Sequence, residues 1–226
     1  MSAAEKPLEI VVNETTVVSG LFVCPDNPLA ALLLGHGAGA GMQHPSMATL
    51  AQGLHDRSIA TLRYQFPYMQ KGGGRPDPPA VCHATVHAAA AKGMELLPKA
   101  PWFAGGRSFG GRMTSQASAA GLIGNMRGLV FFAFPLHPAG KPDDSRAEHL
   151  FKVSVPMLFL QGERDALADL KLLKAVIAKL GERAELKLFE HADHSFHVPA
   201  KIGKTDAQLR GEVLDAARDW ISARGA

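Results

Sequence analysis

The sequence predicts an α/β protein with a mostly parallel sheet of about seven or eight strands, flanked by helices on both faces. Three observations carry this prediction. Apolar segments typical of strands alternate along the chain with longer segments whose apolar residues recur at helical spacing. Several strand segments are apolar throughout, as in strands buried on both faces of a parallel sheet. A chain of 226 residues with 46% hydrophobic and 20% charged side chains can also bury one sizeable core, so residues 1–226 are expected to form a single domain.

The first half of the chain is expected to supply five strands, of which the first two form an antiparallel pair. These strands are expected at 8–12, 16–24, 29–35, 59–64 and 102–106. A helix is predicted from Pro45 to Arg57, because proline suits the first turn of a helix, and a long helix is predicted at 80–97. Residues 65–79 are dense in glycine and proline and are expected to form a loop.

The second half is expected to continue the alternation of helices and strands. Strands are expected at 128–134, 155–162 and 185–190, and helices at 110–123, 167–181 and 206–224. Only about twenty residues join the strand at 128–134 to the next strand, which is too short for a cap of several helices. No large cap domain is therefore expected.

Charge and composition exclude several classes of function. The formal net charge is +3 and the basic residues form no run, so no nucleic-acid surface is expected. Cys24 and Cys82 lack the spacing of metal ligands, and two cysteines in a chain of this length indicate a reducing compartment. No signal peptide is visible, and the longest apolar runs, of about six residues, are too short to span a membrane. We expect a cytoplasmic protein with no membrane partner.

The segment 106–110 reads Gly-Arg-Ser-Phe-Gly and matches the pattern G-x-S-x-G. A serine on a sharp turn between a strand and a helix adopts a strained conformation, so the residues two before and two after it must lack side chains. This turn exposes the hydroxyl group at the carboxyl end of the sheet, where open α/β folds place their sites. Ser108, which follows a predicted strand and precedes a helix of small residues, is therefore the candidate nucleophile.

A neutral serine needs a histidine as base and a carboxylate to orient that histidine. In this class of fold the acid precedes the histidine in the chain, and each follows a strand. Asp165 is the favoured acid; the alternatives are Glu163, Asp169, which is expected to serve a helix N-terminus, and the pair Asp143 and Asp144 one strand earlier.

Three histidines follow the strand at 185–190, and one of them is expected to be the base. His194 is favoured because it lies in a loop a few residues beyond the strand and can reach back over the sheet. His191 directly follows the strand end, and His197 comes just before a proline. We expect the remaining histidines to be solvated or structural.

An anion hole requires two backbone N–H groups directed at the developing oxyanion. One is expected from Phe109, the residue after the nucleophile, and the other from the glycine-rich turn at 35–44. Ala38 is the favoured second donor, with Gly39 as the alternative, and His36 is expected to anchor this loop. A phosphate-binding loop is the rival interpretation, but no Lys-Ser/Thr pair follows these glycines and G-x-G-x-x-G is absent.

Five stretches together resemble the α/β-hydrolase superfamily, and in particular its small, lidless, dienelactone-hydrolase-like branch: LLLGHGAGAGMQHPSM, LRYQFPYMQKGGGRPDPP, AGGRSFGGRM, LQGERDAL and HADHSFHVP. More narrowly, the sequence is similar to the serine-nucleophile group that contains the testis-expressed and NSL-complex-subunit proteins. The resemblance implies Ser108, Asp165 and His194 as the triad, with Ala38 and Phe109 as anion-hole donors. True dienelactone hydrolases have a cysteine nucleophile where this chain has Ser108.

Several residues around this turn are candidates for contact with a substrate. The cations could hold a substrate carboxylate, whereas structural ion pairs are the alternative for the two arginines of the strands and solvation is the alternative for the two loop cations. The cationic candidates are Arg63, Arg107 and the loop cations Lys71 and Arg75. The candidates for the pocket wall, for which a place in the core is the alternative, are Met42, Tyr68, His137, Phe66 and Phe109.

The sequence therefore predicts a serine hydrolase of the carboxylesterase or thioesterase type, acting on a small-molecule ester or thioester of small or medium acyl length. Neither a metal nor an organic cofactor is implied. An acyltransferase with the same triad and a catalytically idle protein-binding module are the alternatives. The oligomeric state does not follow from the sequence.

Overall fold

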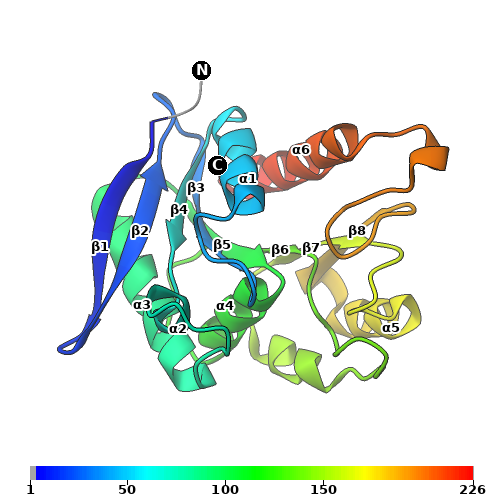
Figure 1. The fold of residues 1–226 in the computed structure, drawn as a ribbon, viewed down its shortest axis with the longest axis horizontal. Coiled ribbons are helices and arrows are strands. Elements are labelled where there is room, and N and C mark those ends of the chain that lie inside the picture. The colour runs from blue at the N-terminus through cyan, green and yellow to red at the C-terminus, as the bar shows by residue number, and fades with distance from the viewer. Residues whose placement is uncertain (1–3, 226) are drawn as a thin grey trace.

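The computed structural model describes residues 4–225, which form one eight-stranded sheet covered by helices on both faces (Figure 1). The strands are β1 (Lys6–Asn13), β2 (Thr16–Val23), β3 (Ala30–Gly35), β4 (Ile59–Tyr64), β5 (Trp102–Arg107), β6 (Leu129–Phe132), β7 (Met157–Gly162) and β8 (Ala184–Phe189). The helices are α1 (Pro45–His55), α2 (Pro67–Gln70), α3 (Pro79–Leu96), α4 (Phe109–Ala119), α5 (Leu170–Leu180) and α6 (Asp206–Gly225), with 3₁₀ segments η1 (Ser145–Lys152), η2 (Gly181–Arg183) and η3 (Ala200–Ile202).

The strand order is β1-β2-β4-β3-β5-β6-β7-β8. β2 pairs in an antiparallel manner with both β1 and β4, and all pairs from β4 to β8 are parallel. The predicted fold class and the predicted antiparallel opening pair are confirmed. Because β3 to β8 are parallel, the loops that follow these strands gather at one edge of the sheet, where a site can be assembled.

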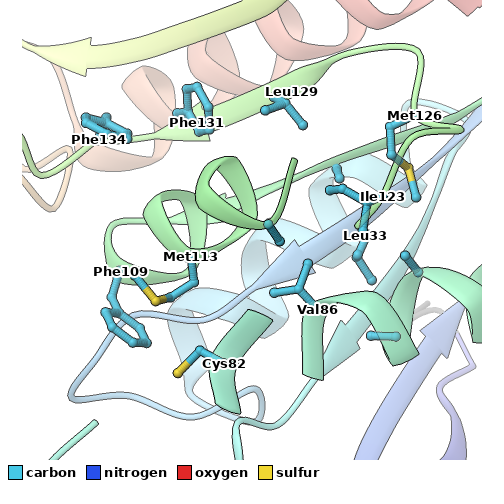
Figure 2. Close-up of a cluster of buried hydrophobic side chains, with 14 of the residues drawn as sticks. Leu33, Cys82, Val86, Phe109, Met113, Ile123, Met126, Leu129, Phe131 and Phe134 are labelled. Carbon is cyan, nitrogen blue, oxygen red and sulfur yellow. The ribbon is translucent and has the colours of Figure 1, made fainter. Parts of the chain in front are cut away.

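Two apolar layers hold the helices on the sheet. Side chains such as Leu34, Phe103 and Val130 form a layer with α1 and α6, which lie on one side of the sheet in Figure 1. A second and larger layer lies under α3, α4 and α5. Figure 2 shows part of it, where Cys82 on α3 and Met113 on α4 point into the space between the two helices.

Local structure departs from the sequence prediction in two places and agrees with it in a third. The segment 65–79, expected as a loop, contains the short helix α2, which Pro67 begins. The helix expected at 110–123 ends at Ala119, and Gly121 follows in a left-handed conformation (φ 76°) that terminates it. The connection after β6 contains η1 but no cap of several helices, which confirms the expected absence of a large cap.

Candidate active site

Ser108 lies on the turn between β5 and α4 with φ 51° and ψ −116°, a conformation that non-glycine residues rarely adopt. The two glycines of the pattern leave no room for side chains. A Cβ atom on Gly106 would meet the carbonyl group of Gly35, and one on Gly110 would meet the same backbone. The N–H group of Ser108 donates to the carbonyl oxygen of Phe132 at 3.0 Å, which ties the turn to the end of β6. The turn is held tightly from both sides.

His194 lies between Ser108 and Asp165 and makes a hydrogen bond with each. Its Nε2 atom is 2.9 Å from the Ser108 Oγ atom, and its Nδ1 atom is 2.7 Å from the Asp165 Oδ2 atom. The carboxylate side chain of Asp165 is completely buried, while the imidazole ring is 23% exposed. The structure thus brings together the three side chains that the sequence singled out, in the geometry that lets a histidine remove a serine proton.

A buried glutamine, which the sequence analysis missed, supports the acid. The Nε2 atom of Gln161 donates to the Asp165 Oδ2 atom at 2.5 Å, and its Oε1 atom accepts from the N–H group of Phe134 at 2.9 Å. The other carboxylate oxygen, Oδ1, accepts from the Leu167 N–H group at 2.8 Å. These two donors hold the carboxylate in position, facing the histidine. A polar residue at the end of the otherwise apolar strand MLFLQG was the available signal.

The alternative acids Asp169 and Asp143 make hydrogen bonds with backbone groups away from His194. Asp169 accepts from the N–H group of Leu172 at 3.0 Å and caps α5, as expected from the sequence. Asp143 is exposed and accepts from Ser145 N–H at 2.6 Å, and these hydrogen bonds with Ser145 lower its pKa. None of the hydrogen bonds of the described residues joins these carboxylates to His194.

The rival histidines also lie outside the constellation. His197 is exposed and its Nδ1 atom is 2.8 Å from the Asp206 carboxylate, a hydrogen bond that raises the pKa of His197. His191 occupies a turn with φ 60°, two residues after the end of β8. His194 alone among the three histidines of this loop contacts both Ser108 and an aspartate in the described part of the chain.

The two candidate anion-hole donors belong to turns that touch each other. Phe109 is the first residue of α4, so its N–H group has no acceptor within the helix. Ala38 lies in the turn that follows β3. Gly35 packs backbone to backbone against Gly110, because a Cβ atom added to Gly35 would be 3.1 Å from the Gly110 Cα atom. The loop after β3 and the N-terminus of α4 are therefore immediate neighbours, as a shared anion hole requires.

Three hydrogen bonds hold the loop after β3 in place, all from the segment that follows β4. The Phe66 N–H group donates to His36 Nε2 at 3.1 Å, the Met42 N–H group donates to Gln65 Oε1 at 2.8 Å, and the Tyr68 hydroxyl donates to the Ala38 carbonyl at 2.8 Å. These hydrogen bonds fix the segment 65–68 against the loop after β3, with Phe66 and Tyr68 both buried.

His36 is an anchor, as the sequence predicted. Burial lowers the pKa of His36 to about 4, although its hydrogen bond to the Gly37 carbonyl oxygen partly opposes this. The ring therefore stays neutral, with a proton on Nδ1 that is donated to Gly37 at 2.8 Å. Only the neutral ring can accept the Phe66 N–H group at Nε2.

Arg63 is not placed to contact a substrate, contrary to the sequence expectation. It is completely buried in β4, pairs with Glu5, and donates to the Met42 carbonyl oxygen at 2.9 Å. The guanidinium group thus stabilises the loop after β3 through its hydrogen bond to the Met42 carbonyl oxygen. Arg63 is therefore part of a structural ion pair, which was the alternative to contact with a substrate.

His137, Met42 and Tyr68 are also structural in this conformation. His137 is 3% exposed, and its ring bonds to the Pro138 carbonyl oxygen at 2.8 Å and to the Asp169 N–H group at 2.7 Å. Met42 and Tyr68 are 3% and 4% exposed. Tyr68 acts on the anion-hole loop through its hydroxyl group rather than by lining an open cleft.

Arg107 differs from these residues, because its guanidinium group lines a cavity. This cavity has a volume of about 290 Å³ and lies between α1, the His194 loop and the start of α6. Its wall includes Arg107, Phe132 and Ser195. Arg107 precedes Ser108 in the chain, Ser195 follows His194, and the Phe132 carbonyl oxygen accepts the Ser108 N–H group. A hollow of this size, lined by the residue that precedes the serine, suits a short organic group.

A parallel sheet in this strand order, with a serine on a tight turn and an aspartate and a histidine following later strands, defines the α/β-hydrolase class of protein. Residues 28–222 match the alpha/beta hydrolase domain family, and the chain belongs to that family.

Solved structures share the fold. A dienelactone hydrolase from Anabaena variabilis has a TM-score of 0.78 at 18% identity, with 100% of both chains covered. A lidless α/β serine hydrolase from Xanthomonas campestris has a TM-score of 0.75 at 20% identity, over 96% of this chain and 94% of the other. The esterase domain of a Rhodothermus marinus protein has a TM-score of 0.74 at 13% identity, over 99% and 100%. The resemblance to the α/β-hydrolase superfamily is confirmed, and the chain shares its fold with lidless and dienelactone hydrolases. The narrower resemblance to the testis-expressed and NSL-complex-subunit proteins stays a prediction.

None of the helices within residues 4–225 is long and apolar enough to cross a membrane. In the same part of the chain, no group of three or more histidine, cysteine, aspartate or glutamate side chains is arranged to hold a metal ion.

Proposed function

We propose that this chain is a serine hydrolase that cleaves a small or medium-chain ester or thioester through an acyl-enzyme on Ser108, His194 and Asp165. The observation that carries the proposal is the position of His194, 2.9 Å from the serine oxygen and 2.7 Å from the buried carboxylate. A module that only binds other proteins has no physical need for a serine in a strained conformation with both partners in place.

The geometry supports a two-step reaction. The Ser108 Oγ atom attacks the acyl carbon, its proton passes to His194 Nε2, and Asp165 stabilises the imidazolium ion that forms. The oxyanion accepts hydrogen bonds from the N–H groups of Ala38 and Phe109, each of which is worth about 3 kcal/mol of barrier in such sites. His194 then protonates the departing alcohol or thiol. Water repeats the sequence on the acyl-enzyme, which releases the acid and restores the serine.

The absence of a large cap supports a small substrate. Between β6 and β7 the chain forms only η1 and its flanking turns, and the cavity beside Arg107 has a volume of about 290 Å³. Long acyl chains usually need a larger apolar surface for burial than such a hollow offers.

An alkyl fluorophosphonate tests the proposal without knowledge of the substrate. An activated Ser108 oxygen displaces fluoride from phosphorus, and intact mass then shows one added group. We expect rapid single labelling of the unmodified sequence and none of Ser108→Ala or His194→Ala. His197→Ala is the matched control, because this neighbouring histidine also pairs with an aspartate but lies outside the triad. Equal labelling of His194→Ala, or no labelling of folded protein, would contradict the proposal.

A further inference from the structure

Arg107 is a cation beside the nucleophile without a carboxylate partner. Its Nη1 atom donates to the Ser46 Oγ atom at 2.8 Å and its Nη2 atom to the Ser195 Oγ atom at 3.2 Å, and both acceptors are neutral hydroxyl groups. No ion pair of Arg107 is found within residues 4–225. Partial burial lowers the pKa of Arg107, and the charge of Asp193 opposes this only in part.

Asp193, the acid whose charge raises the pKa of Arg107, already accepts hydrogen bonds from backbone groups. The Oδ1 atom of Asp193 accepts from the N–H groups of Ser195 and His197, at 2.7 Å and 3.0 Å, and so holds the turn that carries His194. The guanidinium group therefore retains N–H donors and a positive charge that the folded chain does not neutralise. A partly buried charge of this kind is costly unless a ligand completes its environment.

The cavity next to Arg107 has the composition of a binding site. Leu50, Phe132, Phe196 and Val213 provide apolar walls, and a second cation, Arg210, lies on the same cavity. Both cations thus lie around an apolar hollow, which suits a short hydrocarbon chain that ends in an anion.

An acidic residue also lines this cavity, but its charge is compensated. The carboxylate of Asp206 accepts from Val198 N–H at 3.0 Å and lies 2.8 Å from His197 Nδ1. It is the first residue of α6, where a helix dipole also stabilises negative charge. Asp206 therefore leaves the charge of Arg107 largely unopposed.

The cavity adjoins the triad through residues next to it in the chain, although Ser108, His194 and Asp165 are not among the residues that line it. Arg107 directly precedes Ser108, so their Cα atoms are about 3.8 Å apart. Ser195 directly follows His194, and the Phe132 carbonyl oxygen accepts the Ser108 N–H group. We infer that this cavity binds a carboxylate at the end of a short apolar chain of the substrate, with Arg107 as the residue that selects it. The inference rests on the proposed function and names its substrate class.

The carboxylate could belong to the acyl group or to the alcohol, and the experiment includes both. On the acyl side, the monoethyl esters of succinic, glutaric and adipic acid are compared with ethyl esters of monocarboxylic acids of equal chain length. On the alcohol side, 4-acetoxybenzoate is compared with 4-methylphenyl acetate. The measured quantity is the ratio of kcat/KM for the acidic ester to that for its neutral partner, within one protein preparation.

We expect the acidic member of at least one pair to be favoured by about tenfold or more in the unmodified sequence. Arg107→Gln should lower the ratio by about ten- to a hundredfold, the loss expected for one hydrogen bond between charged groups. Arg107→Lys should retain part of the preference. Because the ratio does not depend on the fraction of folded protein, a damaged preparation still gives a valid result. An unchanged ratio in Arg107→Gln would overturn the inference. Arg107 would then have only a structural role, which is to connect Ser46 of α1 with Ser195 of the His194 loop.

Arg112→Gln is the matched control. Arg112 is also a partly buried arginine without an ion pair in the described residues, but it lies on α4 over the Phe109 ring and outside this cavity. Its substitution should leave the ratio unchanged, whatever it does to the absolute rate.

A binding measurement separates failure of this inference from failure of the proposed function. By calorimetry, Ser108→Ala should bind monoethyl adipate more tightly than ethyl hexanoate, and the double variant with Arg107→Gln should lose that difference. Binding with this selectivity, in a protein that fluorophosphonate does not label, would contradict the hydrolase alone. Labelling and hydrolysis of both ester types without selectivity would contradict the carboxylate site alone.

Discussion

Single buried hydrogen bonds fix the geometry on which the proposed chemistry depends. Gln161 lies in β7, is fully buried, and joins the Asp165 carboxylate to the Phe134 N–H group. Both ends of its amide are satisfied, so the residue connects the acid to the end of β6. An apolar residue of similar volume would fill the same space and make neither bond.

The variant Gln161→Met should therefore destabilise the protein by about 1–3 kcal/mol, because it leaves a buried backbone N–H group without an acceptor. The rate of fluorophosphonate labelling should also fall, since Asp165 loses a donor. Urea unfolding measures the first effect and mass spectrometry the second. Gln116→Met, which removes only a contact with His83, is the control, and equal destabilisation by both variants would refute the assignment.

Tyr68 holds the loop that carries the candidate anion-hole donor Ala38. Tyr68→Phe removes the hydroxyl group that holds the Ala38 carbonyl oxygen at 2.8 Å, and leaves the buried ring in place. We expect kcat for a simple ester to fall about fivefold, which corresponds to about 1 kcal/mol, with KM nearly unchanged. A change in KM with constant kcat would instead point to direct contact with the substrate.

The triad could be read from the sequence, whereas its supports could not. Ser108, Asp165 and His194 each follow a strand in the order that the fold requires, and this order is visible in one dimension. Gln161 and Tyr68 act through contacts with backbone groups 27 and 30 positions away. Such contacts depend on side-chain directions that periodicity does not specify, and for the same reason Arg63 could not be recognised as buried.

At the level of elements, the nucleophile turn depends on contact between two backbones. The start of α4 lies against the end of β3 so closely that neither Gly35 nor Gly110 has space for a Cβ atom. The atoms that a Cβ atom on Gly110 would meet belong to the main chain of Gly35 and His36, which cannot rotate away as the end of a side chain can. The two turns that carry the candidate anion-hole donors therefore have one relative position.

Gly110→Ala should destabilise the protein by more than about 2 kcal/mol or prevent folding, because the new methyl group overlaps the backbone of β3. Gly211→Ala is the control of the same chemistry: Gly211 lies inside α6 with open space around it, and alanine there should stabilise the protein by about 0.5–1 kcal/mol. Thermal unfolding of both variants tests the pair. Similar effects in the two variants would show that helix propensity, and not the contact with β3, decides the result.

Long elements were predictable and short ones were not. The apolar runs of β3, β5 and β7 and the periodic pattern of α5 have lengths at which the pattern is clear. The helix α2 has four residues inside a segment rich in glycine and proline, so local propensity favours a loop. Its hydrogen bonds with the loop after β3 and with Ser19 of β2 stabilise it, and these are tertiary contacts.

For the whole molecule, one buried and one partly buried histidine predict how stability depends on pH. Burial lowers the pKa of both His36 and His149 from 6.5 to about 4, and for His149 the nearby charges of Arg112 and His83 add to the effect. Above pH 6.5 these rings are neutral in the folded and the unfolded chain. Between pH 6.5 and 4 the unfolded chain binds protons that the folded chain does not. The free energy of unfolding should therefore fall as the pH falls through this window.

For His36, which is fully buried, a pKa of about 4 instead of 6.5 corresponds to roughly 3 kcal/mol of lost stability by pH 4. Urea unfolding at several pH values measures this dependence. In His149→Gln the slope between pH 6.5 and 4 should be shallower, because one of the two groups is removed. A slope unchanged by this substitution would show that His149 does not contribute.

The separation of the triad along the chain has a consequence for the study of folding. His194 lies 29 positions after Asp165 and 86 positions after Ser108, and the strands between them are joined in parallel. The serine can therefore become reactive only after β5 to β8, which carry the triad, have paired, and contacts so far apart in the sequence form slowly. During refolding, the time at which fluorophosphonate begins to label Ser108 would mark the pairing of β5 to β8, and its delay after the recovery of helical signal would measure the lifetime of partly folded states.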